Sequence, residues 1–242
     1  MHAEDLRLTS ARKNGVGATK TRKRAIAGRH DSTCGSNVVI RVIIVGDDGR
    51  RHLDILRKLA RGTKSLMTEN HVARLWNEAS LDDIVFAISP YIGNSLEDCY
   101  RFWPNSSVGE TIDMIIQAFE AIVFVHDLGI DLCQSNCLVQ WHPESLSTMR
   151  VPLSRPRVFL TDFETAYEFP PGLAQEQRTL CGLPYDPFKA DVWQLAEVPE
   201  LDAVLELVYT PDVSARLSAM EARDKLAAVV DDTASIALLI PP

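Results

Sequence analysis

The sequence predicts an α+β fold of two lobes, in which a small strand-rich lobe precedes a mainly helical lobe. Two observations predict it. Runs of β-branched residues enclose one short amphipathic segment over residues 37–90, whereas apolar residues at helical spacing dominate residues 91–242. A chain of 242 residues with 46% hydrophobic content is long enough to bury a core of this size.

Residues 1–36 differ from the rest of the chain in charge. They contain eight Lys and Arg against three Asp and Glu, whereas the remainder contains 17 against 30, and the net charge of the chain is −8. A Gly- and Ser-containing basic segment with few aromatic residues is typical of disorder, so we expect a disordered basic tail. The alternative is an import signal in TKTRKRAIAGR, and nucleic-acid binding is not expected.

The remaining composition favours a soluble intracellular protein. No apolar run approaches the roughly 18 residues that span a bilayer. The five Cys are an odd number without a secretory signal, which indicates reduced thiols and a cytoplasmic or nuclear location.

The first lobe is expected over residues 37–90. The run VVIRVIIV (residues 38–45) predicts a buried strand that ends at the turn GDDG. The segment RRHLDILRKLARG places Leu53, Leu56 and Leu59 at helical spacing and ends at Gly62, which predicts a short helix. The stretches HVARLWNEAS and DDIVFAIS predict two strands joined by a polar turn.

The second lobe is expected over residues 91–242 and begins with a break at PYIGNS. GETIDMIIQAFEAIVFVHDLG predicts a long buried helix that ends at Gly129, with His126 on its apolar face. Two short strands, CLVQW and RVFLTDF, follow it. Three helices are then predicted, in PFKADVWQLA, LDAVLELVY and SAMEARDKLAAVV, the last with Ser218 near its start.

Three polar residues beside these strands suit phosphoryl transfer. The reaction needs a group that orients the acceptor hydroxyl, and Asp131 is the candidate. Asn136, five residues on, and Asp162, at the end of a strand, offer an amide and a carboxylate oxygen, which suit Mg²⁺. The alternative is that Asp131 and Asn136 only stabilise a turn.

In order along the chain, these motifs resemble those of the eukaryotic protein kinases. VVIR is similar to the VAIK strand motif, HLDIL to the C-helix, SPYIGNS to the segment that joins the lobes, IDLCQSN to HRDLxxxN, and TDFE to DFG. KADVWQLA and PDVSARLSAMEA resemble the later DVWxxG and DPxxRxTAxEA motifs. The resemblance covers residues 38–230 and is closest to the kinase-like domains abundant in mushroom-forming fungi.

The resemblance implies a reduced two-lobe protein-kinase-like fold with ATP and Mg²⁺ held between the lobes. It also implies that Asp191 ties down the catalytic loop and that Arg216 takes the place of the Arg of the closing motif. The implied site residues are Asp131 as the catalytic group, Asn136 and Asp162 as metal ligands, and Arg41, Ser89 and Tyr91 as nucleotide-binding residues.

Several positions depart from the family pattern. No GxGxxG precedes the first strand, and no APE triplet lies in the 26 residues between TDFE and DVW. Arg41 replaces the phosphate-binding Lys, His52 replaces the Glu of the C-helix, and Glu164 replaces the Gly of DFG. We expect His52 to be a surface residue of its helix rather than a catalytic base. The chain has Gly129 and Ile130 where the family has His-Arg. We therefore expect weak or absent turnover.

Three functions fit these observations. The first is ATP- and Mg²⁺-dependent phosphoryl transfer to Ser/Thr hydroxyls of a protein, with activity weak or lost. The second is a catalytically inactive pseudokinase that acts as an interaction scaffold for a protein partner. The third is transfer to a small molecule, since DFE after DLxxxN also resembles the aminoglycoside and choline kinases. The sequence leaves the oligomeric state open.

Overall fold

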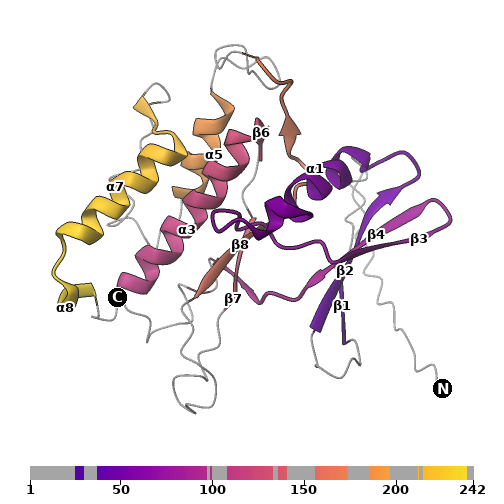
Figure 1. Cartoon of the computed structure of the whole chain (residues 1–242), viewed down its shortest axis with the longest axis horizontal. Coiled ribbons are helices and arrows are strands. Elements are labelled where there is room, and N and C mark those ends of the chain that lie inside the picture. Colours follow the sequence, from indigo (N-terminus) through magenta and orange to yellow (C-terminus); the bar gives the residue numbers. More distant parts are fainter. Residues whose placement is uncertain are drawn as a thin grey trace, which may run out of the picture.

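A computed structural model of the protein shows two lobes joined by a short linker, residues 91–93. It describes residues 25–29, 37–96, 99, 108–132, 136–140, 156–173, 186–196, 212 and 215–238. In Figure 1 a four-stranded sheet lies on the right, most of the helices lie on the left, and helix α1 lies between them. The expected helix over residues 201–209 lies outside the described residues.

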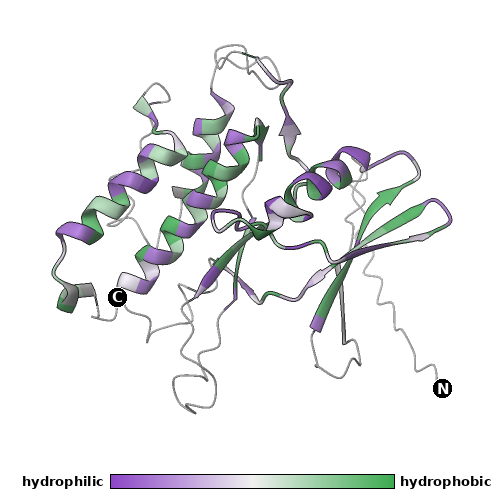
Figure 2. Ribbon diagram, in the orientation of Figure 1, coloured by the Kyte–Doolittle hydropathy of each residue, from purple (hydrophilic) through white to green (hydrophobic). Residues whose placement is uncertain are grey.

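The first lobe contains one antiparallel sheet with the strand order β1-β2-β4-β3. Its two central strands are the most hydrophobic, as Figure 2 shows. Strand β2 buries Val38, Ile43 and Ile44, whereas its end residues Asn37 and Val45 are exposed. The strands are β1 (Ala25–Arg29), β2 (Asn37–Val45), β3 (Asn77–Leu81) and β4 (Ile84–Pro90).

Strand β1 lies within the segment for which a disordered tail is expected. It pairs with β2 in the register Ala25↔Arg41 to Arg29↔Asn37, so ordered chain is present upstream of residue 37. The physical reason is that the short apolar stretch between basic residues completes the edge of the sheet beside β2. Residues 1–24 and 30–36 lie outside the described part of the chain.

Helix α1 (Arg50–Ala60) covers the sheet, and its apolar side joins the core through Leu53, Ile55 and Leu59. It is followed by the short helix η1 (Thr63–Leu66). His52 is only 4% exposed, although a surface position was the favoured interpretation of the sequence. The correction follows from spacing, because His52 lies three residues before Ile55 and seven before Leu59 on the same side of the helix.

The second lobe is arranged around the long helix α3. Two small sheets, with strand orders β5-β7-β8 and β6-β9, lie beside it. The strands are β5 (Asn94–Ser95), β6 (Ile130–Asp131), β7 (Asn136–Gln140), β8 (Arg157–Thr161) and β9 (Tyr167–Glu168). The helices are α3 (Val108–Asp127), α5 (Pro187–Ala196), α7 (Ala219–Asp232) and α8 (Ser235–Leu238).

Most predicted elements of this lobe are confirmed. Helix α5 has the bounds of PFKADVWQLA, and Ser218 caps α7 by accepting a hydrogen bond from the Glu221 amide. The Glu221 side chain accepts one from the Ser218 amide in return, which completes a capping box. None of the helices in the described residues is long and apolar enough to cross a bilayer.

The two lobes share one hydrophobic core, which runs from Ile43 and Leu53 in the first lobe to Phe119 and Leu160 in the second. The extended segment after η1 connects them directly. The Leu160 amide of β8 donates a hydrogen bond to the His71 carbonyl at 2.8 Å, and the Ala73 amide donates one to the Leu160 carbonyl at 3.0 Å. This shared packing fixes the position of the first lobe on β8, and therefore the space between the lobes.

Candidate functional site

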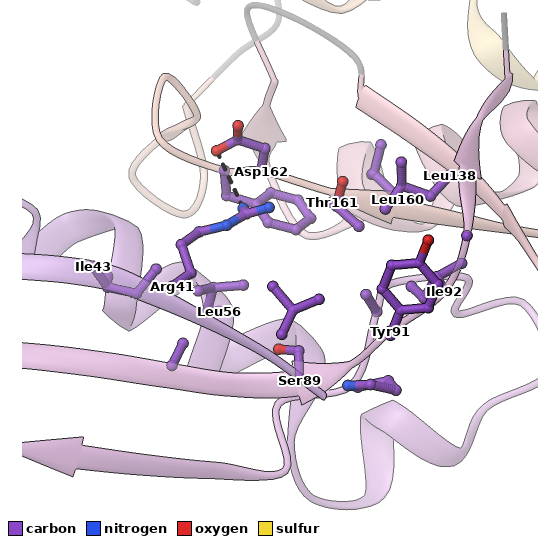
Figure 3. Close-up of a pocket in the computed structure, with 16 residues that line it drawn as sticks. Arg41, Ile43, Leu56, Ser89, Tyr91, Ile92, Leu138, Leu160, Thr161 and Asp162 are labelled. Atoms are coloured by element: carbon purple, nitrogen blue, oxygen red, sulfur yellow. Dashed lines mark ion pairs between the residues drawn. The ribbon is translucent and has the colours of Figure 1, made fainter. Parts of the chain in front are cut away.

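A pocket with a volume of about 190 Å³ lies between the two lobes. Its walls come from β2, β4, α1, the linker and the hairpin β7-β8, and most of its lining is apolar. Small-molecule sites usually measure roughly 300–1,000 Å³, so this one encloses only part of a nucleotide-sized ligand. Figure 3 shows Arg41 and Asp162 on one side of it and Tyr91 and Ile92 on the other.

Four predicted site residues, Arg41, Ser89, Tyr91 and Asp162, line this one pocket. Arg41 comes from β2 of the first lobe, whereas Asp162 directly follows β8 of the second. The Arg41 Nη1 lies 3.5 Å from the Asp162 Oδ1, and the two side chains are 28% and 37% exposed. The structure therefore brings a cation and a carboxylate from distant parts of the chain together inside the pocket (Figure 3).

The backbone of Asp162 has an unusual conformation. Its φ is +64°, in the left-handed region that residues other than Gly rarely adopt. The following side chain, Phe163, is 1% exposed and belongs to the shared core, which holds the turn in place. Such strain persists where the surrounding packing fixes it and is common at binding sites. Here it accompanies a carboxylate that lines the pocket.

Asn136 lies on the strand next to Asp162. It is the first residue of β7 and pairs with Thr161, the residue that precedes Asp162. The Thr161 hydroxyl also donates a hydrogen bond to the Asn136 carbonyl at 3.3 Å. The predicted metal ligands are thus neighbours across one strand pair, and their carboxylate and amide oxygens are of the type that Mg²⁺ accepts. Asn136 itself does not line the pocket.

Asp131 is the predicted site residue that belongs to a different sheet. It belongs to β6, pairs with Tyr167 of β9 and is 1% exposed, and it is not part of the pocket lining. The loop between Asp131 and Asn136, residues 133–135, lies outside the described residues. The arrangement shown by the structure therefore buries the predicted catalytic carboxylate.

The linker gives the pocket its outer wall. The Tyr91 amide donates a hydrogen bond to the Asn37 carbonyl at 3.0 Å, and the Tyr91 side chain is 47% exposed. Gly93 has a φ of +142°, and a Cβ atom there would lie 2.6 Å from the Val139 carbonyl oxygen. Only Gly allows the linker to approach β7 this closely, so Gly93 sets the width of the pocket at this end.

Helix α1 faces the pocket with an apolar residue. Leu56 lines it, whereas His52, at the position where the resemblance places an acid, does not. The only acid of α1 is Asp54, whose side chain is 72% exposed and lies 3.8 Å from Arg57. Sequence analysis did not identify Leu56 as a lining residue, although its place one turn after His52 was a signal that could have found it.

Asp191 ties the segment after β6 to helix α5, as the resemblance implies. It is 0% exposed, and its Oδ2 accepts a hydrogen bond from the Leu132 amide at 2.9 Å. The same oxygen lies 3.0 Å from the Nε2 of His126, whose ring stacks on Phe188. His126 is therefore a core residue with a polar partner, as predicted.

The Arg216 side chain contacts an aromatic ring rather than a carboxylate among the described residues. Its Cζ lies 4.6 Å from the centroid of the Trp193 ring, and within the described residues no carboxylate lies within ion-pair distance of it. A cation over an indole ring is a favourable contact. Arg216 of the PDVSARLSAMEA motif is thus joined to α5 through the Trp193 ring.

The comparisons with known proteins agree with this architecture at the level of the fold. No protein-family model matches the chain, and no curated protein shows a significant match. Among solved structures, the chain is similar to the one described as the Rad53 kinase domain and SCD2. The TM-score is 0.55 at 14% identity, over 81% of this chain and 85% of that one. The chain therefore adopts a reduced two-lobe protein-kinase-like fold.

Proposed function

We propose that this chain is a protein kinase homologue that binds an adenine nucleotide between its lobes, and in which phosphoryl transfer to Ser/Thr hydroxyls of a protein is slow or lost. The observation that carries the proposal is the pairing of Arg41 of the first lobe with Asp162 of the second at 3.5 Å, on one side of the pocket. Arg41 matches the position that contacts the phosphates in the eukaryotic protein kinases, and Asp162 matches the position that binds the metal.

The pocket suits the binding half of this function. Its apolar walls would take the flat base, with Ser89 and Tyr91 on the linker side. Asp162 and Asn136 would hold Mg²⁺, which supplies charge neutralisation to the phosphates when bound. Arg41 would contact phosphate oxygens, because a guanidinium binds them with two parallel hydrogen bonds.

Two observations favour slow or absent transfer. A group that orients the acceptor hydroxyl has to come within hydrogen-bond reach of it, and Asp131 is 1% exposed. In active kinases a Glu of the C-helix pairs with the phosphate-binding Lys, whereas α1 contributes Leu56 to the pocket. The burial of Asp131 also favours the second candidate, a pseudokinase that serves as a scaffold for a protein partner.

Thermal unfolding of the full chain with millimolar ATP and Mg²⁺ tests the binding half. A ligand that binds only the folded state stabilises it by about 2.7 kcal/mol at a hundredfold excess over Kd. We expect a clear rise in Tm with ATP, and little or no phosphate on a generic Ser/Thr protein substrate. No rise would reject nucleotide binding and leave the scaffold function. Transfer that survives in Asp131→Asn would reject the assigned role of Asp131.

A further inference from the structure

Arg41 depends on Asp162 for its charge partner. Among the described residues no other carboxylate lies within ion-pair distance of the Arg41 guanidinium. The guanidinium is a cation, and the pocket that it lines is largely apolar. Charges in such surroundings interact more strongly than in water.

The acid that would share this charge in the family is missing from α1. Leu56 occupies the pocket side of the helix, and the only acid of the helix, Asp54, is exposed beside Arg57. Among the described residues that line the pocket, the charged ones are therefore Arg41 and Asp162, where an active kinase has a Lys, a Glu and the metal-binding Asp.

The charges of this site disfavour a divalent ion and favour a phosphate. A divalent ion on Asp162 would take the only carboxylate that neutralises Arg41 and would leave two cationic groups beside each other. An anionic phosphate is attracted by the same guanidinium. The planar head of Arg41 can also hold two phosphate oxygens with two parallel hydrogen bonds, whereas the ammonium of Lys acts as a point charge.

We infer that the phosphates of a nucleotide bind directly to Arg41 without a required divalent ion, while Asp162 orients the guanidinium. The ligand class is a nucleoside di- or triphosphate in its metal-free form. This inference rests on the proposed function and adds the element of the site that holds the phosphates. Competition between Arg41 and Mg²⁺ for Asp162 is then a physical cause of slow transfer.

Titration calorimetry of the full chain with ATP in EDTA, ATP with Mg²⁺, and adenosine tests the inference. We expect the Kd for ATP in EDTA to lie within about threefold of that with Mg²⁺. Arg41→Met keeps the length of the side chain without its charge, and it should weaken ATP binding in EDTA by roughly tenfold or more while adenosine binding is retained. Arg157→Met is the matched control, because Arg157 is exposed on β8 and does not line the pocket.

Asp162→Asn separates the two roles of Asp162. Asn tolerates a positive φ, so the turn at +64° is kept while the negative charge is removed. The variant should bind metal-free ATP more tightly, because the Asn side-chain oxygen can still accept a hydrogen bond from Arg41 while the charge that repels phosphate is gone.

The outcomes distinguish the two proposals. ATP binding that requires Mg²⁺ and is lost in Asp162→Asn overturns the inference and leaves the proposed function intact. ATP binding in EDTA that Arg41→Met leaves unchanged also overturns the inference alone. No binding of ATP or adenosine in either medium rejects the proposed function, and the inference with it.

Discussion

The Nε2 of His126, at the end of α3, lies 3.0 Å from the Oδ2 of Asp191, in the middle of α5. Because Asp191 also accepts the Leu132 amide, one buried carboxylate joins two helices to the segment that follows β6. The stacked ring of Phe188 covers His126, with 4.3 Å between the ring centroids. This junction holds Leu132, directly after β6, against the helices of the second lobe.

Asp191→Ala is expected to lower the free energy of unfolding by about 2–3 kcal/mol, since it leaves the buried Leu132 amide without its acceptor. Chemical denaturation of the purified variant measures this value. Asp224→Ala is the control, because the Asp224 side chain is 61% exposed and pairs only with the neighbouring Arg223 among the described residues. It should change stability by less than about 0.5 kcal/mol. An Asp191→Ala variant as stable as this control would show that the junction is not structurally important.

The parts of this junction were predicted from local motifs, and the resemblance implied the role of Asp191, whereas the contact between His126 and Asp191 was not predicted. ADVW placed the carboxylate on a helix, and the apolar spacing of α3 placed His126 on the buried face. The burial of Asp131, in contrast, could not be predicted from local motifs. It depends on the pairing of β6 with β9, between residues 36 or more apart in the chain, and no local spacing shows that pairing. The same holds for β1, whose strand conformation depends on β2.

The candidate site was also predictable only in part. Arg41 and Asp162 each end or interrupt an apolar run, so their types and positions were visible in the sequence. Their pairing between the lobes was not visible, because it depends on how the lobes pack through the segment at His71 and Ala73. For His52 the sequence showed a spacing that places it on the buried side of α1, but the polarity of the residue suggested a surface position.

Lys58 of α1 connects the two lobes by a charged contact. Its Nζ lies 2.7 Å from the Glu168 Oε1 of β9 and donates to the Leu128 carbonyl at 3.3 Å. In a double-mutant cycle, Lys58→Met and Glu168→Gln should show a coupling energy of about 0.2–1 kcal/mol, as exposed ion pairs do. The coupling should fall at high salt, because exposed charges are screened.

Denaturation at low and high salt measures that coupling. The matched pair for comparison is Arg50 with Asp47, whose side chains are 67% and 99% exposed and which belong to one lobe. A smaller coupling is expected there. If the Lys58 and Glu168 effects are additive at low salt, the contact does not connect the lobes energetically.

Val39 narrows the pocket from the side of β2. It stands where the VAIK motif has Ala and lines the pocket, as does Leu138 of β7 in the other lobe. Val39→Ala should therefore widen the space for a flat base and tighten ATP binding by roughly three- to tenfold, within the range that a few carbon atoms contribute in apolar sites. Titration calorimetry with ATP and with adenosine measures the change.

Val42→Ala removes the same two methyl groups from the same strand at a residue that does not line the pocket. It should leave both affinities unchanged. Weaker or equal binding in Val39→Ala would show that Val39 does not restrict the site.

Glu78 of β3 holds α1 on the sheet and makes this contact sensitive to pH. Its carboxylate accepts hydrogen bonds from Arg57 at 3.0 and 2.6 Å and lies 2.9 Å from Arg61. The hydrogen bond from Arg57 and the charges of both Arg residues lower the pKa of Glu78 below its ordinary value of 4.5, although burial opposes this. The folded chain thus holds this proton less tightly than the unfolded chain.

The contribution of Glu78 to stability is therefore complete above the unfolded pKa and is lost as the pH falls through the lower, folded pKa. Glu78→Gln should destabilise the protein by about 0.5–1 kcal/mol at neutral pH. The difference in Tm between the variant and the unmodified chain should shrink as the pH is lowered below about 4.5, where protonation removes the same charge. Tm measured across this range for both proteins gives the result. Glu69→Gln, at an exposed residue with no ion pair in the described part of the chain, should follow the unmodified chain at every pH. A Tm difference for Glu78→Gln that stays constant with pH would show that the contact acts through packing rather than through charge.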